Sequence, residues 1–166
     1  PEIIAVSNQL FYNDRLKAMR KNKTGAVQWF EVNASNQQEA EVRLIASLCE
    51  KYKERWSRKE YSVGIVTPFR AQVDRLQKNI SHVRIDTAHR FQGEECDVII
   101  LSLCVSNRLS TQQWEFIEAP ELINVAITRA KERLIIVGDR AVCTQRGGLL
   151  ASLSSIVGAS SNSDYR

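Results

Sequence analysis

Residues 97–103, with the sequence DVIILSL, form a nearly continuous apolar run. Two more runs of this kind lie at residues 63–67 (VGIVT) and 133–139 (RLIIVGD). A strand that is covered on both faces needs few polar residues, and such runs are therefore typical of parallel sheets. These three segments predict buried strands of a mostly parallel β-sheet.

Helical patterns alternate with the strands. Together with two weaker runs, the predicted strands lie at residues 25–32, 61–67, 83–86, 97–103 and 133–138. Ser35 and Gln38 have the spacing of a capping box before a stretch with apolar residues every three or four positions. A second helix is predicted around Val73 and Leu76, and a third begins near Pro120. Alternating strands and helices indicate an α/β fold with helices on both faces of the sheet.

Size and composition indicate an ordinary globular domain. The chain has 166 residues, of which 43% are hydrophobic and 25% charged, and this length suits a single domain. No apolar run approaches the roughly 18 residues that span a bilayer, and the first ten residues lack the pattern of a secretory signal. The four cysteines form no C-x-x-C pair, which disfavours a metal site or a disulfide framework. We therefore expect no membrane partner and a cytoplasmic location, with nucleoid or nuclear locations also compatible.

The net charge of +4 is compatible with a polyanionic partner. Part of the excess lies in residues 14–23, which contain five basic residues and one acid. Such a run fits either a solvated face or a surface that follows phosphates, and charge alone leaves both readings open.

Familiar catalytic loops are absent from the sequence. A phosphate-binding loop needs a Gly-Lys pair in the order G-x-x-x-x-G-K-[ST], and no Gly-Lys pair occurs. The patterns G-x-S-x-G and H-E-x-x-H are absent as well. We therefore expect that this chain alone does not hold a nucleotide tightly.

Three ordered segments carry a family resemblance: VGIVTPFRAQ (63–72), DTAHRFQGEECDVIILSL (86–103) and LINVAITRAKERLIIVGD (122–139). Together they resemble motifs IV, V and VI of superfamily 1 helicases, in particular the nonsense-decay-factor-like branch that moves 5′ to 3′. SNQLFYNDRL (7–16) resembles the stretch that follows motif IIIa. The resemblance spans roughly residues 3–140 and implies a second RecA-like motor domain, which we place at residues 1–157. The low-complexity stretch GASSNSDYR (158–166) is expected to be a disordered polar tail.

The resemblance also implies an ATP site shared between two domains. Arg129 matches the arginine finger of motif VI, which neutralises charge on the γ-phosphate. Gly93 and Glu95 match the motif V residues that approach the nucleotide. The phosphate loop and the ligands of Mg²⁺ would then belong to an N-terminal motor domain, and this chain would hold no metal by itself. Without the resemblance, Arg129 would be read as a surface ion-pair partner and Glu95 as a solvated acid.

A strand-binding track is implied at the ends of two predicted strands. Thr67 and Thr87 match positions that contact phosphates of single-stranded DNA or RNA, contacts that position a strand without reading its sequence. Pro68 and His89 would lie nearby against sugar or base, although a lone histidine equally fits a structural role. Since parallel strands end at one edge of a sheet, we expect ligand contacts just after the apolar runs.

Aromatic residues offer weaker candidates for base stacking. Phe69 and Phe91 flank the track residues, but each also fits a core position. Trp114 lies in the predicted loop 106–119, where an exposed indole could stack on a base.

The preferred function is half of an ATP-dependent helicase that is inactive as an isolated chain. One rival is a non-catalytic nucleic-acid-binding module that has kept the helicase fold. The other is a small phosphatase-like or flavodoxin-like α/β enzyme with an accidental motif match, which would need its own ligand loop after the first strand. Residues 33–36 offer no phosphate cradle there.

Overall fold

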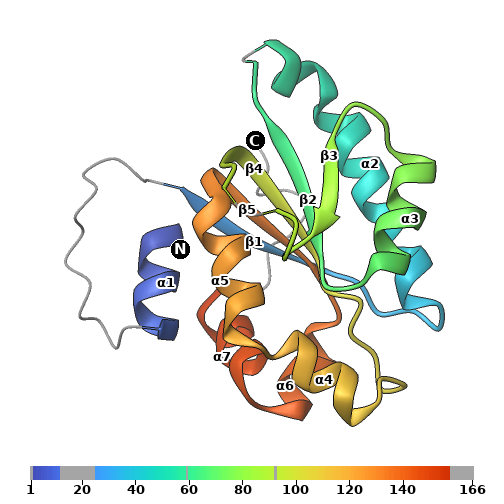
Figure 1. Ribbon diagram of the computed structural model, residues 1–166, viewed down its shortest axis with the longest axis vertical. Helices are drawn as coiled ribbons and strands as arrows, with labels where there is room; N and C mark the ends of the chain where they lie inside the picture. Colours follow the sequence, from blue (N-terminus) through green and yellow to red (C-terminus); the bar gives the residue numbers. More distant parts are fainter. Residues whose placement is uncertain (1, 12–24, 59, 92, 158–166) are drawn as a thin grey trace.

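Five parallel strands form the centre of the molecule, in the order β1-β5-β4-β2-β3 (Figure 1). The computed structural model describes residues 2–11, 25–58, 60–91 and 93–157. The strands are β1 (Ala26–Glu31), β2 (Val63–Thr67), β3 (Arg84–Thr87), β4 (Cys96–Ser102) and β5 (Ala130–Gly138). All five predicted strands are confirmed. β5 starts earlier than predicted because Ala130 already pairs with Cys96 at the start of β4.

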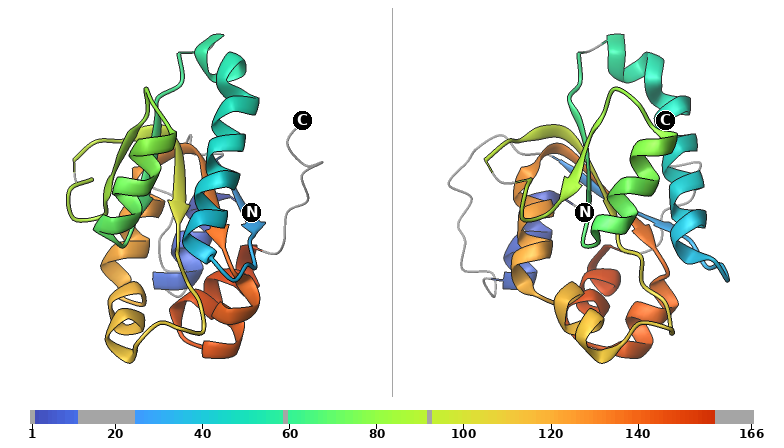
Figure 2. Two further views of the ribbon diagram at one scale, coloured as in Figure 1. Left: turned by 90° about the vertical axis from the view of Figure 1, so that its right-hand side faces the viewer. Right: turned by 45° about the vertical axis from the view of Figure 1, so that its right-hand side comes forward.

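Helices cover both faces of the sheet, so the predicted three-layer α/β/α architecture is confirmed (Figure 2). One face carries α2 (Gln37–Arg58) and α3 (Arg70–Asn79). The opposite face carries α1 (Ile3–Phe11), α5 (Pro120–Arg129), α6 (Arg140–Arg146) and α7 (Leu149–Val157). The short α4 (Thr111–Ile117) lies at the end of the sheet where the strands finish.

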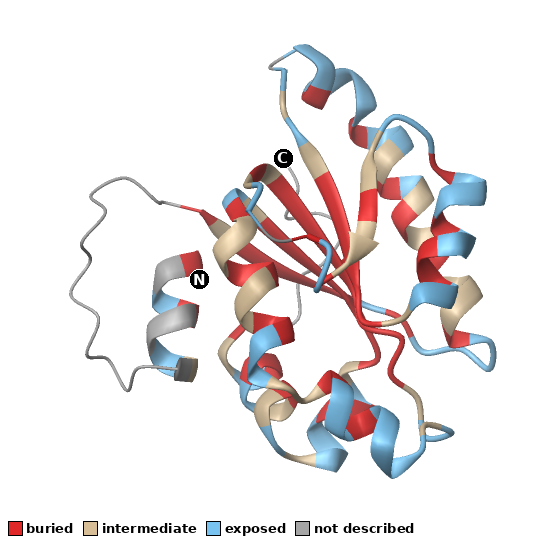
Figure 3. Ribbon diagram, in the orientation of Figure 1, coloured by how far each residue is buried: buried red, intermediate tan, exposed pale blue. Residues whose placement is uncertain are grey.

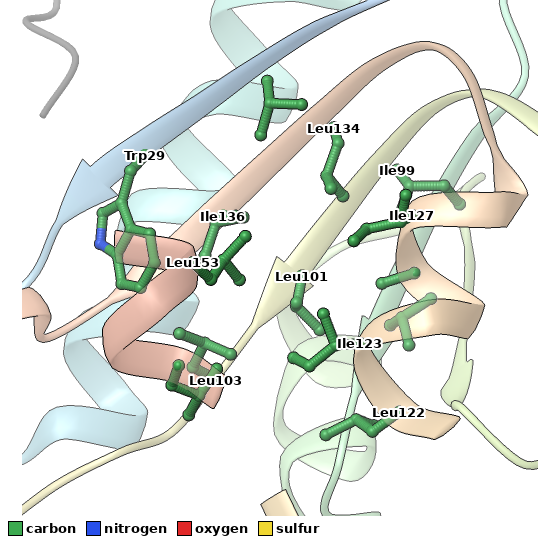
Figure 4. Close-up of a cluster of buried hydrophobic side chains, with 14 of the residues drawn as sticks. Trp29, Ile99, Leu101, Leu103, Leu122, Ile123, Ile127, Leu134, Ile136 and Leu153 are labelled. Carbon is green, nitrogen blue, oxygen red and sulfur yellow. The ribbon is translucent and has the colours of Figure 1, made fainter. Parts of the chain in front are cut away.

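The two faces have separate hydrophobic cores because side chains alternate along each strand. In β5, Leu134 and Ile136 belong to the cluster beneath α5 and α7, whereas Ile135 and Val137 face α2 and α3. All four are buried (Figure 3). Figure 4 shows the first cluster, where side chains of the central strands meet those of α5 and α7. A sheet buried on both faces explains why its strands are continuous apolar runs.

Two local predictions are wrong. The capping box between Ser35 and Gln38 does not form, since α2 starts at Gln37. Instead the Asn36 side chain accepts a hydrogen bond from the Glu39 N–H (3.4 Å), and the Gln37 side-chain oxygen Oε1 accepts one from the Ala34 N–H (3.2 Å). Asparagine is as good an N-cap as serine, and it lies one residue nearer the helix.

The predicted loop 106–119 is also more ordered than expected, because it contains α4. Ser110 and Gln113 form a reciprocal capping box at the start of this helix. None of the helices in the described ranges is long and apolar enough to cross a membrane. The basic residues 14–23 and the predicted tail 158–166 fall outside the described part of the chain.

Candidate functional site

The carboxyl edge of the sheet brings the predicted track residues together. Thr67 of β2 and Thr87 of β3 are register partners in neighbouring parallel strands. Pro68 follows Thr67 directly, and His89 lies in the turn after Thr87. These four residues come from two segments of the sequence and lie at one edge of the sheet, where β2 and β3 end (Figure 1).

The four residues differ in how far they are exposed to solvent. Thr67 is fully buried, with no exposed surface, and Pro68 is buried as well. The Thr67 hydroxyl faces the Cys104 thiol at 4.0 Å rather than solvent. A phosphate in solvent therefore cannot reach this hydroxyl in the conformation described, which corrects the expectation for Thr67. Thr87 is half-buried and His89 is exposed, so these two remain accessible candidates.

A tight turn presents His89 to solvent. The Thr87 carbonyl accepts hydrogen bonds from the N–H groups of Arg90 (3.1 Å) and Phe91 (3.0 Å). The Asp86 carboxylate accepts one from the Thr87 N–H (2.9 Å) and lies 3.5 Å from the Arg70 guanidinium. These hydrogen bonds fix the backbone of the turn at residues 88–90, both through the Thr87 carbonyl and through the Thr87 N–H.

A buried polar cluster around Glu41 lies next to Thr67 and includes Cys104, which contacts the Thr67 hydroxyl. Both Glu41 oxygens accept hydrogen bonds from the Cys104 N–H (3.0 and 3.1 Å). The carboxylate also accepts from the Ser102 hydroxyl (2.9 Å) and the Gln37 amide (2.9 Å). Cys104 has a φ of 57°, in the left-handed region. These bonds tie α2 to the turn after β4, and that turn packs against Thr67.

The Glu41 carboxyl has an unusual pKa. Its side chain has no exposed surface, and burial raises its pKa from 4.5 to about 7, against the opposing effect of the hydrogen bonds that it accepts. The residues that donate to it, Cys104, Ser102 and Gln37, are uncharged. A buried carboxylate without a cationic partner is costly, so its hydrogen bonds must hold it firmly in place.

Phe91 anchors the connection from β3 to β4. Its ring is fully buried, in agreement with the core reading of the sequence. The ring packs directly on Gly64 of β2, where a side chain would overlap it. On its other side the Arg84 guanidinium lies 4.3 Å from the ring centroid. Arg84 also donates to the Arg90 carbonyl (3.0 Å) and pairs with Glu94.

The predicted ATP residues lie at the opposite, amino-terminal edge of the sheet. Cys96 and Ala130 are register partners at the starts of β4 and β5, so Glu95 and Arg129, each one residue earlier, lie on neighbouring positions. β4 has seven residues, which places its ends about 20 Å apart. Glu95 and Arg129 therefore precede their strands, whereas the predicted strand-contact residues lie at or just after the ends of theirs.

The side chain of Arg129 has an unsatisfied donor. Arg129 ends α5 and is half-buried, and its Nε is buried without a hydrogen-bond partner within the described part of the chain. Such orphaned donors are rare in folded proteins and call for an explanation. Gly93 has a φ of 86°, and no atom lies within 4 Å of the position that a Cβ would take. The Arg129 side chain thus keeps one donor unused inside the protein, and the turn at Gly93 leaves open space around its Cα.

No metal site is built into this region. In residues 2–11, 25–58, 60–91 and 93–157, no three His, Cys, Asp or Glu side chains are grouped to hold an ion.

The aromatic residue of α4 that is exposed is not the one that the sequence indicated. Trp114 is buried at 4% exposure and packs beneath the Arg146 guanidinium, so the reading of an exposed stacking indole is wrong. Phe116 is instead exposed at 42%. The sequence did not point to Phe116, although the capping-box spacing of Ser110 and Gln113 could have predicted the helix that carries it. It also missed Asn124 of motif VI, whose Oδ1 is a buried atom without a partner among the described residues.

The architecture and its motif positions define a RecA-like motor domain, and comparison with known proteins identifies its family. Residues 21–141 match the sequence model of the AAA domain family. The chain belongs to this family as the C-terminal motor domain of a superfamily 1 helicase of the nonsense-decay-factor-like type.

Individual relatives agree with this assignment. The chain is 33% identical over 121 residues to the DNA polymerase alpha-associated DNA helicase A of Saccharomyces cerevisiae, covering 68% of this chain and 17% of that protein. It is 28% identical over 169 residues to the 5′-3′ DNA helicase ZGRF1 of Mus musculus, covering 84% of this chain and 8% of that protein. The chain thus spans less than a fifth of either relative.

A solved structure supports the fold. The C-terminal domain of a possible DNA helicase from Lactobacillus plantarum superposes with a TM-score of 0.54 at 14% identity. The match covers 95% of this chain and 93% of that one.

Proposed function

We propose that this chain is the second motor domain of a longer ATP-dependent helicase that acts on single-stranded DNA or RNA. In this proposal its amino-terminal edge completes an ATP site whose phosphate loop and Mg²⁺ ligands belong to an N-terminal motor domain. Its carboxyl edge forms part of the strand track. The relatives are helicases of much greater length, which agrees with a chain that supplies one of two motor domains.

The orphaned Nε of Arg129 is the observation that carries the proposal. The half-buried guanidinium has an unused donor, but that atom is enclosed in this conformation, so an anionic partner would reach it only after the side chain moves, as closure of two motor domains would allow. When ATP is bound, its terminal phosphoryl group supplies the bond that is broken and the charge that needs neutralising. Arg129 would contact that phosphoryl group, Gly93 would let the backbone approach it closely, and Glu95 would accept from a ribose hydroxyl or its water.

In this proposal, ATP hydrolysis is coupled to movement along the strand because the two sites lie at opposite edges of one sheet. Arg129 lies at the amino ends of the strands and the Thr87–His89 turn at their carboxyl ends. If ATP draws Arg129 toward the other motor domain, the sheet carries the strand-binding edge with it. Opening and closing of the cleft would then move the protein along the strand, a hinge-type transition.

The test is ATP hydrolysis by the complete protein, with and without a single-stranded oligonucleotide, compared with residues 1–166 alone. We expect strand-stimulated hydrolysis by the complete protein and none by the chain alone. Turnover by the chain alone above about 1 s⁻¹, near that of ordinary enzymes, would contradict the shared site. Strand binding by the complete protein without any ATP hydrolysis would instead favour the non-catalytic binding module.

A further inference from the structure

Three aromatic rings from separate elements meet beside the proposed track; we call them the aromatic cluster. They are Phe69 at the start of α3, His89 in the turn after β3, and Phe116 of α4. The Phe116 ring centroid lies 6.2 Å from that of Phe69 and 6.2 Å from that of His89. Phe116 is also the one large hydrophobic side chain in the described ranges that is exposed, at 42%.

The cluster borders a small hollow of about 210 Å³. Phe116 and His89 line it together with Pro68, which follows β2, and with Leu122 and Val125 of α5. Its walls are mostly apolar, so a charged or strongly hydrated group would be disfavoured inside it. Its size suits one flat ring system and excludes a helix or a strand.

From this arrangement we infer that Phe116 is a stacking residue for one base of the bound single strand, with the base in the hollow beside Pro68. The inference rests on the proposed function and deepens it by adding a base contact to the phosphate contact. An exposed aromatic ring next to a nucleic-acid track is the usual platform for an unpaired base. Phe116 lies outside the helicase motifs, in the segment where the buried Trp114 cannot take this role.

The position of the hollow favours a base over other occupants. His89 lines the hollow and lies two residues beyond Thr87, so a strand whose phosphate contacts Thr87 brings a neighbouring base to Phe116. Arg90, next to His89, is exposed on the same turn and suits the backbone. Glu121 lies at the rim of the hollow, where it repels a phosphate but accepts a hydrogen bond from a base amino group.

The experiment compares two oligonucleotides on the complete protein without ATP: a fluorescent single strand of mixed sequence, and the same strand with abasic sites throughout. Phe116→Ala should weaken binding of the mixed strand about 5- to 100-fold, the range for loss of one stacked base. It should change binding of the abasic strand by less than about twofold. Phe116→Trp should retain the affinity for the mixed strand, because a larger ring also stacks.

Glu115→Ala is the matched control, since this exposed residue precedes Phe116 on α4. It should leave both affinities unchanged, and the thermal midpoints of all variants should agree because Phe116 is not a core residue. Equal loss of both strands in Phe116→Ala would overturn the inference and make Phe116 a contact of the other motor domain. Unchanged binding of both would overturn it while leaving the proposed function intact. Failure of the wild-type protein to bind either strand would overturn both.

Discussion

Thr67 and Thr87 lie opposite each other at the carboxyl ends of β2 and β3, yet only Thr87 is open to solvent. The difference comes from the turn after β4, where the Cys104 thiol lies 4.0 Å from the Thr67 hydroxyl. β3 is the edge strand of the sheet and β2 is not. One of the two threonines is therefore structural, and the other is available to a bound strand.

The first prediction concerns Thr87→Ala in the complete protein. A hydroxyl-to-phosphate hydrogen bond at a half-exposed site contributes about 1–2 kcal/mol, so single-strand affinity should fall about 5- to 30-fold. The loss should be the same for different base sequences and for an abasic strand, because phosphate contacts carry no sequence information. The salt dependence of binding should not change, since no cation is removed. Fluorescence anisotropy at several salt concentrations measures both quantities.

Thr67→Val is the companion variant. It replaces the buried hydroxyl with a methyl group of similar shape, and we expect strand affinity to stay within about twofold while the free energy of unfolding changes by about 1 kcal/mol. A large loss of affinity in Thr67→Val with no loss in Thr87→Ala would show that the threonines have the opposite roles.

A second prediction concerns Arg129→Ala in the complete protein. If its guanidinium neutralises charge on the leaving phosphate, strand-stimulated ATP hydrolysis should fall about a hundredfold or more. Strand affinity without ATP should be nearly unchanged, since Arg129 lies at the other edge of the sheet. Lys131→Ala is the matched control, because Lys131 is an exposed cation two residues away, and it should retain activity within a few-fold. Activity of Arg129→Ala close to wild type would remove it from the ATP site.

Local patterns predicted the strands well, because burial on both faces leaves a direct trace in the sequence. β4 is the clearest case: all of its residues except Asp97 are buried. The sequence likewise predicted that Thr87 and His89 lie at the carboxyl edge of the sheet, because the end of an apolar run in a parallel sheet is also an edge of that sheet.

Long-range packing explains what the sequence did not predict. Thr67 is buried by a turn that lies 37 residues further along the chain, and no local pattern records that contact. Trp114 and Phe116 are two residues apart on α4, about 200° around the helix. One therefore faces the core and the other faces solvent, and only the packing of α4 determines which. The neighbouring positions of Glu95 and Arg129 depend on the register of β4 and β5, in which Cys96 lies opposite Ala130, and the sequence alone does not reveal this register.

A third prediction uses the pKa of Glu41, which burial raises to about 7 from its usual 4.5. The folded state holds this proton more tightly than the unfolded state. Its contribution to stability is therefore complete below about pH 4.5 and is lost as the pH rises through about 7. Relative to Glu41→Gln, which cannot titrate, the wild type should lose on the order of 2 kcal/mol of unfolding free energy between about pH 5 and about pH 8.

Urea denaturation of both proteins at several pH values measures this difference, and other titrating groups cancel in the comparison. The neighbouring Cys104 thiol does not interfere, because burial raises its pKa far above the usual value and keeps it neutral over this range. A pH-independent difference between wild type and Glu41→Gln would mean that the hydrogen bonds from Cys104, Ser102 and Gln37 outweigh burial and keep the carboxyl charged.

The final prediction tests the close packing of Gly64 on Phe91. A Cβ at position 64 would overlap the Phe91 ring and come within 3.1 Å of the Cys96 Sγ, so Gly64→Ala should lower the free energy of unfolding by about 1–3 kcal/mol. Phe91→Leu removes part of the ring, and adding it to Gly64→Ala should therefore cost less than the sum of the two single changes, with a coupling energy of about 1 kcal/mol or more. Gly93→Ala serves as the control, because no atom lies within 4 Å of its Cβ position and only its φ of 86° opposes the change; combined with Phe91→Leu it should be additive. Additive free energies for the Gly64→Ala and Phe91→Leu pair in chemical denaturation would show that this contact does not hold the connection between β3 and β4 in place.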